Sequence, residues 1–255
     1  MTAPAAFDLP GPPRLQQVDH PALFLDLDGT LAAIEPRPED VKPEAWRTGL
    51  LQRLTSRLDG RLAVITGRPL EDVDAILEGA ATAVGAVHGL VRRRPDGVVV
   101  GAPAHPGIQR ARAALHALAG AHPGLILEDK GPSLALHYRL APEEAEPVLA
   151  ETRRLAETYG LKLQLGDKVA ELCTPGCDKG SAVRAFMEEA PFKGAFPIFV
   201  GDDLTDEDGF RAVQELGGLG VLAGPNRSTG AQRRLAGVEA VRDWLQAAVM
   251  EEAAP

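Results

Sequence analysis

Cysteine is scarce in this chain, and its scarcity excludes several kinds of protein. The 255 residues include only Cys173 and Cys177. Their spacing does not match a Cys-x-x-Cys redox or zinc motif, and no second pair of ligands lies nearby in the sequence. A disulfide between them is possible, but two cysteines do not make a disulfide framework. Two reduced thiols in a cytosolic protein are the simpler interpretation.

The chain also lacks an excess of positive charge and any long apolar run. The net charge is −9, which argues against a nucleic-acid partner because such a partner requires a basic surface. No apolar run approaches the roughly 18 residues that a membrane-spanning helix needs. The first 19 residues have neither the basic start nor the apolar stretch of a signal peptide. We therefore expect a cytoplasmic protein with no membrane or nucleic-acid partner.

The first part of the chain alternates strand-like and helical segments. Short apolar runs of the kind found in buried parallel strands are followed by segments with helical spacing of apolar residues. In chain order these segments are 22–27, 44–58, 61–66, 69–79 and 81–89. This alternation predicts a doubly wound, Rossmann-like α/β sheet.

The pattern changes after a hairpin-like segment at 91–100. Helical runs at 108–120 and 143–160 each precede a pair of short strands joined by a tight turn; these strands are 125–130, 133–139, 161–166 and 168–173. Adjacent strands with short turns predict an antiparallel sheet that carries helices on one face. We therefore predict a separate α+β module at about 104–175.

The alternating pattern then returns with helices and strands at 178–190, 196–203, 204–216, 219–224 and 237–252. The predicted organisation is a discontinuous core domain at 20–103 and 176–255, interrupted by the module at 104–175. Residues 1–19 contain several prolines and are predicted to be an irregular tail.

Polar residues follow three of the predicted core strands. The first strand ends at Asp26 and Asp28, and the second ends at Thr66, Gly67 and Arg68. The strand at 196–203 ends with Asp202 and Asp203, and Asp206 follows it. Ligands of open α/β sheets bind outside the carboxyl ends of the parallel strands. We therefore expect these three groups to meet at one site.

The carboxylates in this set require a cation. Residues two apart on a strand point to the same side, so Asp26 and Asp28 are expected to face one site together. Close carboxylates repel each other unless a cation joins them. A lone Asp-x-Asp pair is usually a solvated turn, and Thr205 with Asp208 resembles a helix capping box. The joint occurrence at three strand ends favours a divalent metal, and all-oxygen ligands suit Mg²⁺.

These residues suit phosphoryl transfer. Asp26 is the candidate nucleophile, which would form an aspartyl-phosphate. Asp28 is the candidate acid and base, acting first on the leaving oxygen and then on water. Thr66 would donate a hydrogen bond to the transferring group, and Lys179 would add positive charge near it. Mg²⁺ is predicted to be held by Asp26, the Asp28 main-chain carbonyl and Asp202.

The same residues resemble a known superfamily. The segments DLDGT at 26–30, TGR at 66–68, DKG at 178–180 and GDDLTDED at 201–208 are similar to the four ordered motifs of the haloacid-dehalogenase (HAD) superfamily. In that superfamily the first aspartate is the nucleophile, and an aspartate two residues later marks phosphatases and phosphomutases. Asp203, Asp206, Gly67 and Arg68 are therefore expected to support the site; Arg68 would hold either the motif loop or the substrate.

A narrower resemblance covers about residues 20–247. HGL at 88–90, LEDKGPSLALHYR at 127–139, VAEL at 169–172 and RLAGVEAVRDWL at 234–245 look like segments of bacterial trehalose-6-phosphate phosphatases. The resemblance implies a HAD core with an inserted α/β cap, and a Mg²⁺-dependent hydrolysis of trehalose 6-phosphate to trehalose and phosphate. It also implies that a separate trehalose-6-phosphate synthase supplies the substrate.

The resemblance also assigns sugar-binding residues to the cap. They are Glu128, Lys130, Ser133, Arg139 and Glu171. The family usually has a basic residue two positions after the Glu171 equivalent, where this chain has Cys173. The alternatives are a HAD phosphatase for another sugar phosphate, a phosphomutase, or a non-catalytic sugar-phosphate sensor. Intact Asp26, Asp28, Lys179 and Asp202 argue against the sensor.

Overall fold

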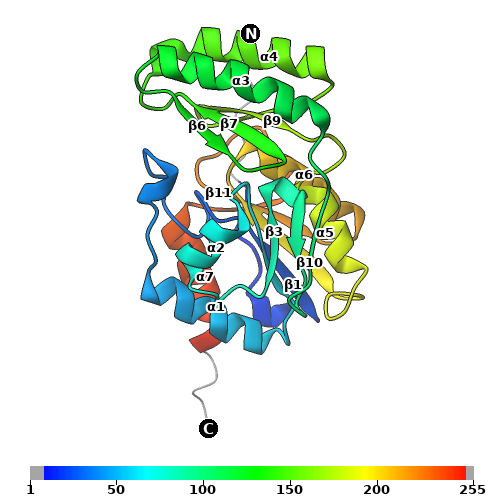
Figure 1. Ribbon diagram of the computed structural model, residues 1–255. Helices are drawn as coiled ribbons and strands as arrows, with labels where there is room; N and C mark the ends of the chain where they lie inside the picture. Colours follow the sequence, from blue (N-terminus) through cyan, green and yellow to red (C-terminus); the bar gives the residue numbers. More distant parts are fainter. Residues whose placement is uncertain (1–8, 251–255) are drawn as a thin grey trace, which may run out of the picture. The chain divides into compact units, whose positions relative to one another are not determined.

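The computed structural model describes residues 9–250, which fold into two compact units (Figure 1). The core unit comprises the described residues of 1–99, 178–202 and 206–255. The inserted unit comprises Val100–Cys177 together with Asp203–Thr205. The domain limits expected at 104 and 175 stay a prediction. No helix among residues 9–250 has both the length and the apolar composition to cross a membrane.

The core unit is built on a mixed eight-stranded sheet. Its strand order is β12-β11-β10-β1-β2-β3-β4-β5. All neighbours from β12 to β3 pair in parallel, and β4 pairs antiparallel with β3. The strands are β1 (Pro21–Leu25), β2 (Leu62–Ile65), β3 (Ala83–Ala86), β4 (Val91–Arg93), β5 (Val99–Gly101), β10 (Phe196–Gly201), β11 (Leu219–Ala223) and β12 (Arg233–Leu235). The predicted doubly wound α/β core is confirmed.

Helices cover both faces of this sheet (Figure 1). Helices α5 (Lys179–Met187) and α6 (Glu207–Glu215) pack together on one face, and α1 (Ala45–Arg57) and α7 (Val238–Met250) contact each other on the opposite side. Helix α2 (Leu70–Leu77) connects β2 to β3.

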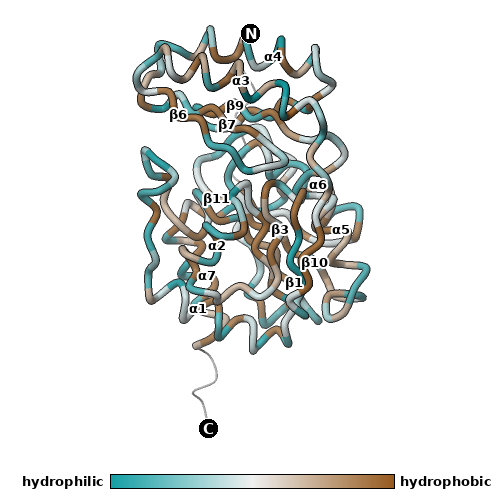
Figure 2. The backbone as a smooth tube through the Cα atoms, viewed as in Figure 1, coloured by the Kyte–Doolittle hydropathy of each residue, from teal (hydrophilic) through white to brown (hydrophobic). Residues whose placement is uncertain are grey.

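Aromatic stacking fills the face under α5. Phe24 of β1 stacks on Phe192 and lies near Phe186, and all three side chains are fully buried. The strongly apolar β1, β3 and β10 in Figure 2 are these buried central strands. The buried rings fix where β1 and α5 lie, and therefore where their ends lie.

The inserted unit is a four-stranded antiparallel sheet with the order β6-β7-β9-β8. Its strands are β6 (Ile126–Asp129), β7 (Ser133–His137), β8 (Lys162–Gly166) and β9 (Val169–Cys173). Helices α3 (Pro106–Ala121) and α4 (Ala145–Tyr159) pack on one face, where Leu134 and Leu136 belong to the apolar core. Because side chains alternate along a strand, Ser133, Ala135 and His137 lie on the face without helices.

Three details differ from the sequence predictions. The helix expected at 204–216 is a 3-10 turn, Leu204–Asp206, followed by α6. The strand expected at 81–89 ends at Ala86, because Val87 and His88 leave extended backbone. Strand β12 was not predicted, since its sequence, Arg-Arg-Leu, is short and charged. The predicted last helix, 237–252, ends partly outside the described residues.

The described part of the N-terminal segment is irregular apart from a 3-10 turn at Leu15–Gln17. Hydrogen bonds hold it against the core unit, among them one from the Gln16 side chain to the Ala247 carbonyl at 2.8 Å. The Trp244 indole donates to the Pro13 carbonyl at 2.9 Å, and the Arg234 amide donates to the Pro10 carbonyl at 3.0 Å.

Candidate active site

A buried lysine joins two aspartates at the carboxyl edge of the core sheet. Asp26 directly follows β1, and its amide donates to the Val200 carbonyl of β10. Lys179 is the first residue of α5, which Asp178 caps by accepting from the Ser181 amide. Lys179 Nζ donates to Asp26 Oδ1 at 2.7 Å and to Asp206 Oδ1 at 2.6 Å. All three side chains are almost inaccessible to solvent.

The charges in this cluster are unbalanced. Burial, followed by the charge of Asp206, raises the pKa of Asp26 well above its ordinary value, although Lys179 opposes this. Burial alone would lower the pKa of Lys179, but Asp206 and Asp26 outweigh it and raise that pKa. Lys179 therefore stays charged, and further positive charge at Asp26 would favour its ionised form.

The acidic cluster fits a divalent cation. One carboxylate oxygen each of Asp26, Asp202 and Asp206 lie within 4.8 Å of one another. Gly29 keeps this arrangement open, because it has a left-handed φ of 80° and a Cβ at its position would overlap the Asp202 carboxylate. Carboxylate oxygens are the ligands that hard cations such as Mg²⁺ prefer. The sequence predicted Asp26 and Asp202 for this cluster and placed Asp206 in support.

Asp206 also shapes the loop that carries Asp202. Its second carboxylate oxygen, Oδ2, accepts from the Asp202 amide at 2.9 Å. The Asp203 carboxylate accepts from the Leu204 amide at 2.6 Å. Asp206 is the N-cap residue of α6, and its side chain makes no capping bond. The capping box considered for Thr205 and Asp208 is therefore not found at the start of α6. The acids after β10 therefore hold a loop in place as well as carrying charge.

Asp28 has a different basic partner from Asp26. The Arg68 guanidinium donates from Nε to Asp28 Oδ2 at 2.7 Å and from Nη2 to Oδ1 at 2.8 Å. Its third nitrogen, Nη1, donates to the Pro38 carbonyl at 2.9 Å. A two-pronged arginine–carboxylate pair fixes orientation as well as distance. Arg68 therefore links the loop after β2 to the loop after β1.

A left-handed turn after β3 holds the Thr66–Arg68 loop. Val87, His88 and Gly89 have φ values of 47°, 53° and 91°. The Val87 amide donates to the Arg68 carbonyl at 3.0 Å and the His88 amide to the Thr66 carbonyl at 2.9 Å.

The two loops also pack closely. A Cβ at Gly67 would overlap the His88 ring, so Gly67 is needed for close packing. Left-handed backbone at a β-branched residue is unfavourable and is usually found where the surroundings impose it. The sequence pattern predicted a strand over 81–89, so this turn was not expected.

A second lysine between two carboxylates lies on the helix-free face of the inserted sheet. Lys130 Nζ lies 3.2 Å from Glu171 Oε2 and 3.7 Å from Glu128 Oε2. Ser133 donates to Glu171 Oε1 at 2.5 Å, and His137 Nε2 lies 2.9 Å from Glu128 Oε2. Burial would lower the pKa of Lys130, but Glu171 and Glu128 outweigh it and raise that pKa. Four of the predicted sugar-binding residues therefore form one bonded group.

The fifth predicted sugar-binding residue has another partner. Arg139 Nη2 donates to the main-chain and side-chain oxygens of Asp167, in the turn between β8 and β9, at 3.0 and 3.3 Å. Cys173 is buried and lies opposite Ser133 in the register of β7 and β9. Burial raises the pKa of the Cys173 thiol, so this thiol is neutral near pH 7.

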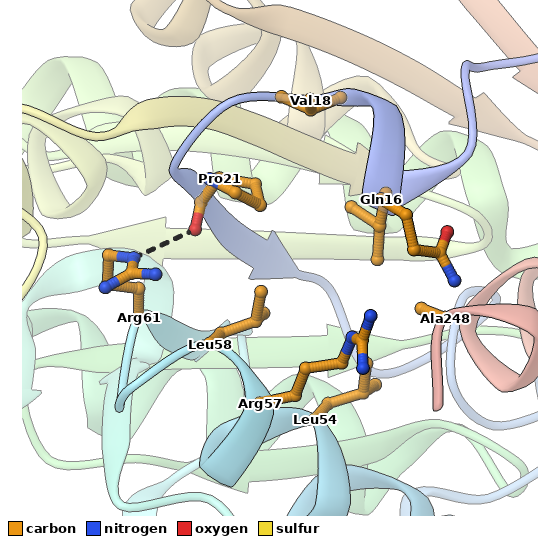
Figure 3. A pocket seen from close by; sticks show the side chains of 9 residues that line it. Gln16, Val18, Pro21, Leu54, Arg57, Leu58, Arg61 and Ala248 are labelled. Carbon is orange, nitrogen blue, oxygen red and sulfur yellow. Dashed lines mark hydrogen bonds between the residues drawn. The ribbon is translucent and has the colours of Figure 1, made fainter. Parts of the chain in front are cut away.

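A pocket of about 300 Å³ lies elsewhere in the core unit (Figure 3). Its lining includes Gln16, Pro21, Arg57 and Ala248, and the Arg61 side chain donates to the Pro21 carbonyl at 3.1 Å. Pro21 is the first residue of β1, whereas Asp26 follows the last. This pocket is therefore at the opposite end of β1 from the acids, and none of the predicted site residues lines it.

The fold of the core unit is that of the HAD-like class of proteins. A solved structure of a haloacid dehalogenase-like hydrolase from Bacteroides thetaiotaomicron matches with a TM-score of 0.63 and 15% identity, covering 88% of this chain and 98% of that one. This likeness shows the fold. Within that class, the family model for trehalose-phosphatase matches residues 24–238. The chain belongs to the trehalose-phosphatase family, whose members are phosphoric monoester hydrolases.

Two similar proteins agree with this assignment. Trehalose-6-phosphate phosphatase of Escherichia coli K12 is 42% identical over 228 residues, covering 88% of this chain and 85% of that protein. A solved structure of a trehalose-6-phosphate phosphatase related protein has a TM-score of 0.76 at 26% identity, covering 89% of this chain and 96% of that one. The resemblance in the sequence motifs is therefore confirmed over most of the chain.

Proposed function

We propose that this protein hydrolyses trehalose 6-phosphate to trehalose and inorganic phosphate. The observation that carries the proposal is the buried Asp26–Lys179–Asp206 cluster at the ends of β1 and β10, in a member of the trehalose-phosphatase family. Such a cluster has the nucleophile and the fixed positive charge that phosphoryl transfer needs. The similar Escherichia coli protein, named for this substrate, supports the choice of sugar phosphate.

Asp26 acts as the nucleophile. One of its carboxylate oxygens is held by Lys179, and the carboxylate attacks phosphorus to form an aspartyl-phosphate while the sugar oxygen leaves. Water then attacks the phosphorus of this acyl phosphate, which releases phosphate and restores the Asp26 carboxylate. Lys179 stabilises the negative charge of the transferring group, and Thr66 donates a hydrogen bond to it.

Asp28 transfers a proton in each of the two steps. It protonates the leaving sugar oxygen and then removes a proton from the attacking water. Arg68 fixes the direction of the Asp28 carboxylate through its two bonds at 2.7 and 2.8 Å. Gly67 lets the His88 ring pack against the same loop. We infer that Arg68 acts on the reaction through Asp28 and holds the motif loop rather than the substrate.

A Mg²⁺ ion is the proposed cofactor, and phosphatases of this fold are generally metal-dependent. Asp26, Asp202 and the Asp28 main-chain carbonyl would hold it, with Asp206 and Asp203 shaping the loop of Asp202. When bound, the ion supplies positive charge that offsets the crowded carboxylates and the substrate phosphate. Burial and the charge of Asp206 raise the pKa of Asp26, so positive charge beside it would favour its ionised form.

The polar face of the inserted sheet is proposed to bind the sugar. Glu128, Lys130, Ser133 and Glu171 offer donors and acceptors within one bonded group, which suits a hydroxyl-rich disaccharide. Arg139 is proposed as a more peripheral contact, since it bonds the Asp167 turn. A separate synthase would supply the substrate, and both enzymes would act in the cytoplasm.

Phosphate release from a panel of sugar phosphates tests the proposal. The panel contains trehalose 6-phosphate, sucrose 6-phosphate, glucose 6-phosphate and an aryl phosphate, each assayed with Mg²⁺ and with a chelator. We expect the highest kcat/KM with trehalose 6-phosphate, free trehalose as product, and loss of activity with the chelator. A preference for another sugar phosphate would refute the substrate, and a phosphorylated isomer would identify a phosphomutase.

A further inference from the structure

The edge strand β8 carries polar side chains on the same face as the sugar-binding group. Its sequence is Lys-Leu-Gln-Leu-Gly, and side chains alternate between the two faces of a strand. Leu163 packs against the apolar core under the helices. Lys162 and Gln164 therefore lie on the opposite, helix-free face.

The register of β8 and β9 places these two residues beside the bonded group. Gln164 is directly opposite Glu171, and Lys162 is directly opposite Cys173. Opposite residues of an antiparallel pair have Cβ atoms about 4.5–5.5 Å apart and interact with each other. Lys162 and Gln164 thus extend the polar face by one strand beyond Glu171.

Four residues form a row across the helix-free face, and their chemistry also indicates a sugar. In order across the sheet they are Glu128, Ala135, Glu171 and Gln164. Ala135 leaves room at the centre, while the acids accept hydrogen bonds and the Gln164 amide both donates and accepts. The neighbouring Cys173 thiol is neutral because burial raises its pKa. The side chains of Lys162 and Gln164 are partly exposed.

We propose that Lys162 and Gln164 are specificity-determining residues that hydrogen-bond hydroxyls of the sugar part of the substrate. The inference rests on the proposed function, because it adds to the sugar face of the same site. Lys162 and Gln164 on β8 lie beside the group of Glu128, Lys130, Ser133 and Glu171 and supply further donors for sugar hydroxyls. A substrate without those hydroxyls gains nothing from β8.

The experiment compares Lys162→Ala, Gln164→Ala and the double variant with the unmodified protein. Initial rates are measured with trehalose 6-phosphate, glucose 6-phosphate and an aryl phosphate. We expect kcat/KM for trehalose 6-phosphate to fall a few-fold for Gln164→Ala and about 10-fold for Lys162→Ala, mostly through KM. The loss with the disaccharide should exceed the loss with the aryl phosphate by these factors.

A matched control lies on the same strand. Leu165→Ala changes the opposite face of β8, where the side chain is 38% exposed, and should leave the ratio of the two kcat/KM values unchanged. Thermal unfolding of each variant identifies a purely structural effect. Equal losses on all substrates, or a lower Tm with an unchanged ratio, would overturn the proposal.

A separate binding measurement keeps this proposal distinct from the proposed function. Calorimetric titration of trehalose onto the unmodified and double-variant proteins should show weaker binding to the variant. If the panel shows that the protein prefers another sugar phosphate, the function fails, and the same variants are tested on that preferred substrate. Unchanged kcat/KM on the preferred substrate would then refute the role of β8 independently.

Discussion

The two units of this protein each hold a lysine between two carboxylates, but they do so differently. In the core unit Lys179 lies 2.7 and 2.6 Å from Asp26 and Asp206, and the group is almost fully buried. In the inserted unit Lys130 lies 3.2 and 3.7 Å from Glu171 and Glu128, and the Glu128 side chain is 20% exposed.

This difference separates reaction chemistry from substrate selection. Short, buried bonds hold charges in fixed positions, as a phosphoryl-transfer site requires. In the inserted unit the side chains of Lys130 and Glu171 are also buried, at 6% exposure each, but the distances are longer and Glu128 is 20% exposed. Sugar hydroxyls are expected to replace the longer of these contacts. Variants of the two groups should therefore differ in what they change, and the following predictions run from the largest expected effect to the smallest.

Replacing Asp26 by Asn should have the largest effect on catalysis. The amide preserves the shape of the carboxylate but is not a nucleophile, so turnover of both sugar and aryl phosphates should fall by at least about 10³-fold. Phosphate release measures the loss, and circular dichroism checks that the fold is intact. Near-normal activity would refute the nucleophilic role.

Replacing Lys179 by Met should cost more stability than replacing Lys130 by Met. Removing Lys179 leaves Asp26 and Asp206 buried without their positive partner, which should lower the free energy of unfolding by about 3–5 kcal/mol. The Lys130 pair has longer bonds, so about 1–3 kcal/mol is expected there. Urea denaturation of both variants measures the difference. Equal losses would show that the two groups are energetically alike.

Replacing Lys130 by Ala should change substrate preference rather than chemistry. We expect kcat/KM for trehalose 6-phosphate to fall about 10- to 100-fold, because a charged donor to the sugar face is lost. The aryl phosphate should lose much less, since it has no sugar hydroxyls. Parallel rates on the two substrates test this, and similar losses on both would remove the assignment of specificity to the inserted unit.

Replacing Arg68 by Ala should lower kcat about 10-fold on every substrate with little change in KM. Arg68 directs the Asp28 carboxylate, and proton transfer depends on that direction. Arg68→Lys should recover only part of the rate, because lysine cannot form the two-pronged pair. A selective effect on the sugar phosphate would instead place Arg68 among the substrate-binding residues.

The smallest expected effect is on stability at acidic pH. Burial would raise the pKa of Glu128, but the bond with His137 and the charge of Lys130 outweigh it, so that pKa lies below its ordinary value of 4.5. The stabilisation is therefore present above about pH 4.5 and is lost as pH falls through the lower folded-state pKa. Glu128→Gln should show less of this loss in Tm measured between pH 6 and pH 3. If the Tm of Glu128→Gln falls between pH 6 and pH 3 as much as that of the unmodified protein, the prediction is wrong.

The sequence by itself determined the class of fold, and it predicted which residues at the strand ends form the candidate site. Apolar runs and helical spacing placed the strands within a few residues, because burial of apolar side chains dictates both patterns. The order of Asp26, Thr66, Lys179 and Asp202 along the chain indicated one site, since parallel strands bring their carboxyl ends to one edge. These features depend on local pattern and on topology alone.

Only the tertiary structure decided which groups bond to which. Asp26 and Asp28 are two residues apart, yet one pairs with Lys179 of α5 and the other with Arg68 after β2. The left-handed turn at Val87 and His88 and the pairing of Gln164 with Glu171 were also invisible in the sequence. Each depends on contacts between segments far apart in the chain, and periodicity carries no information about such contacts.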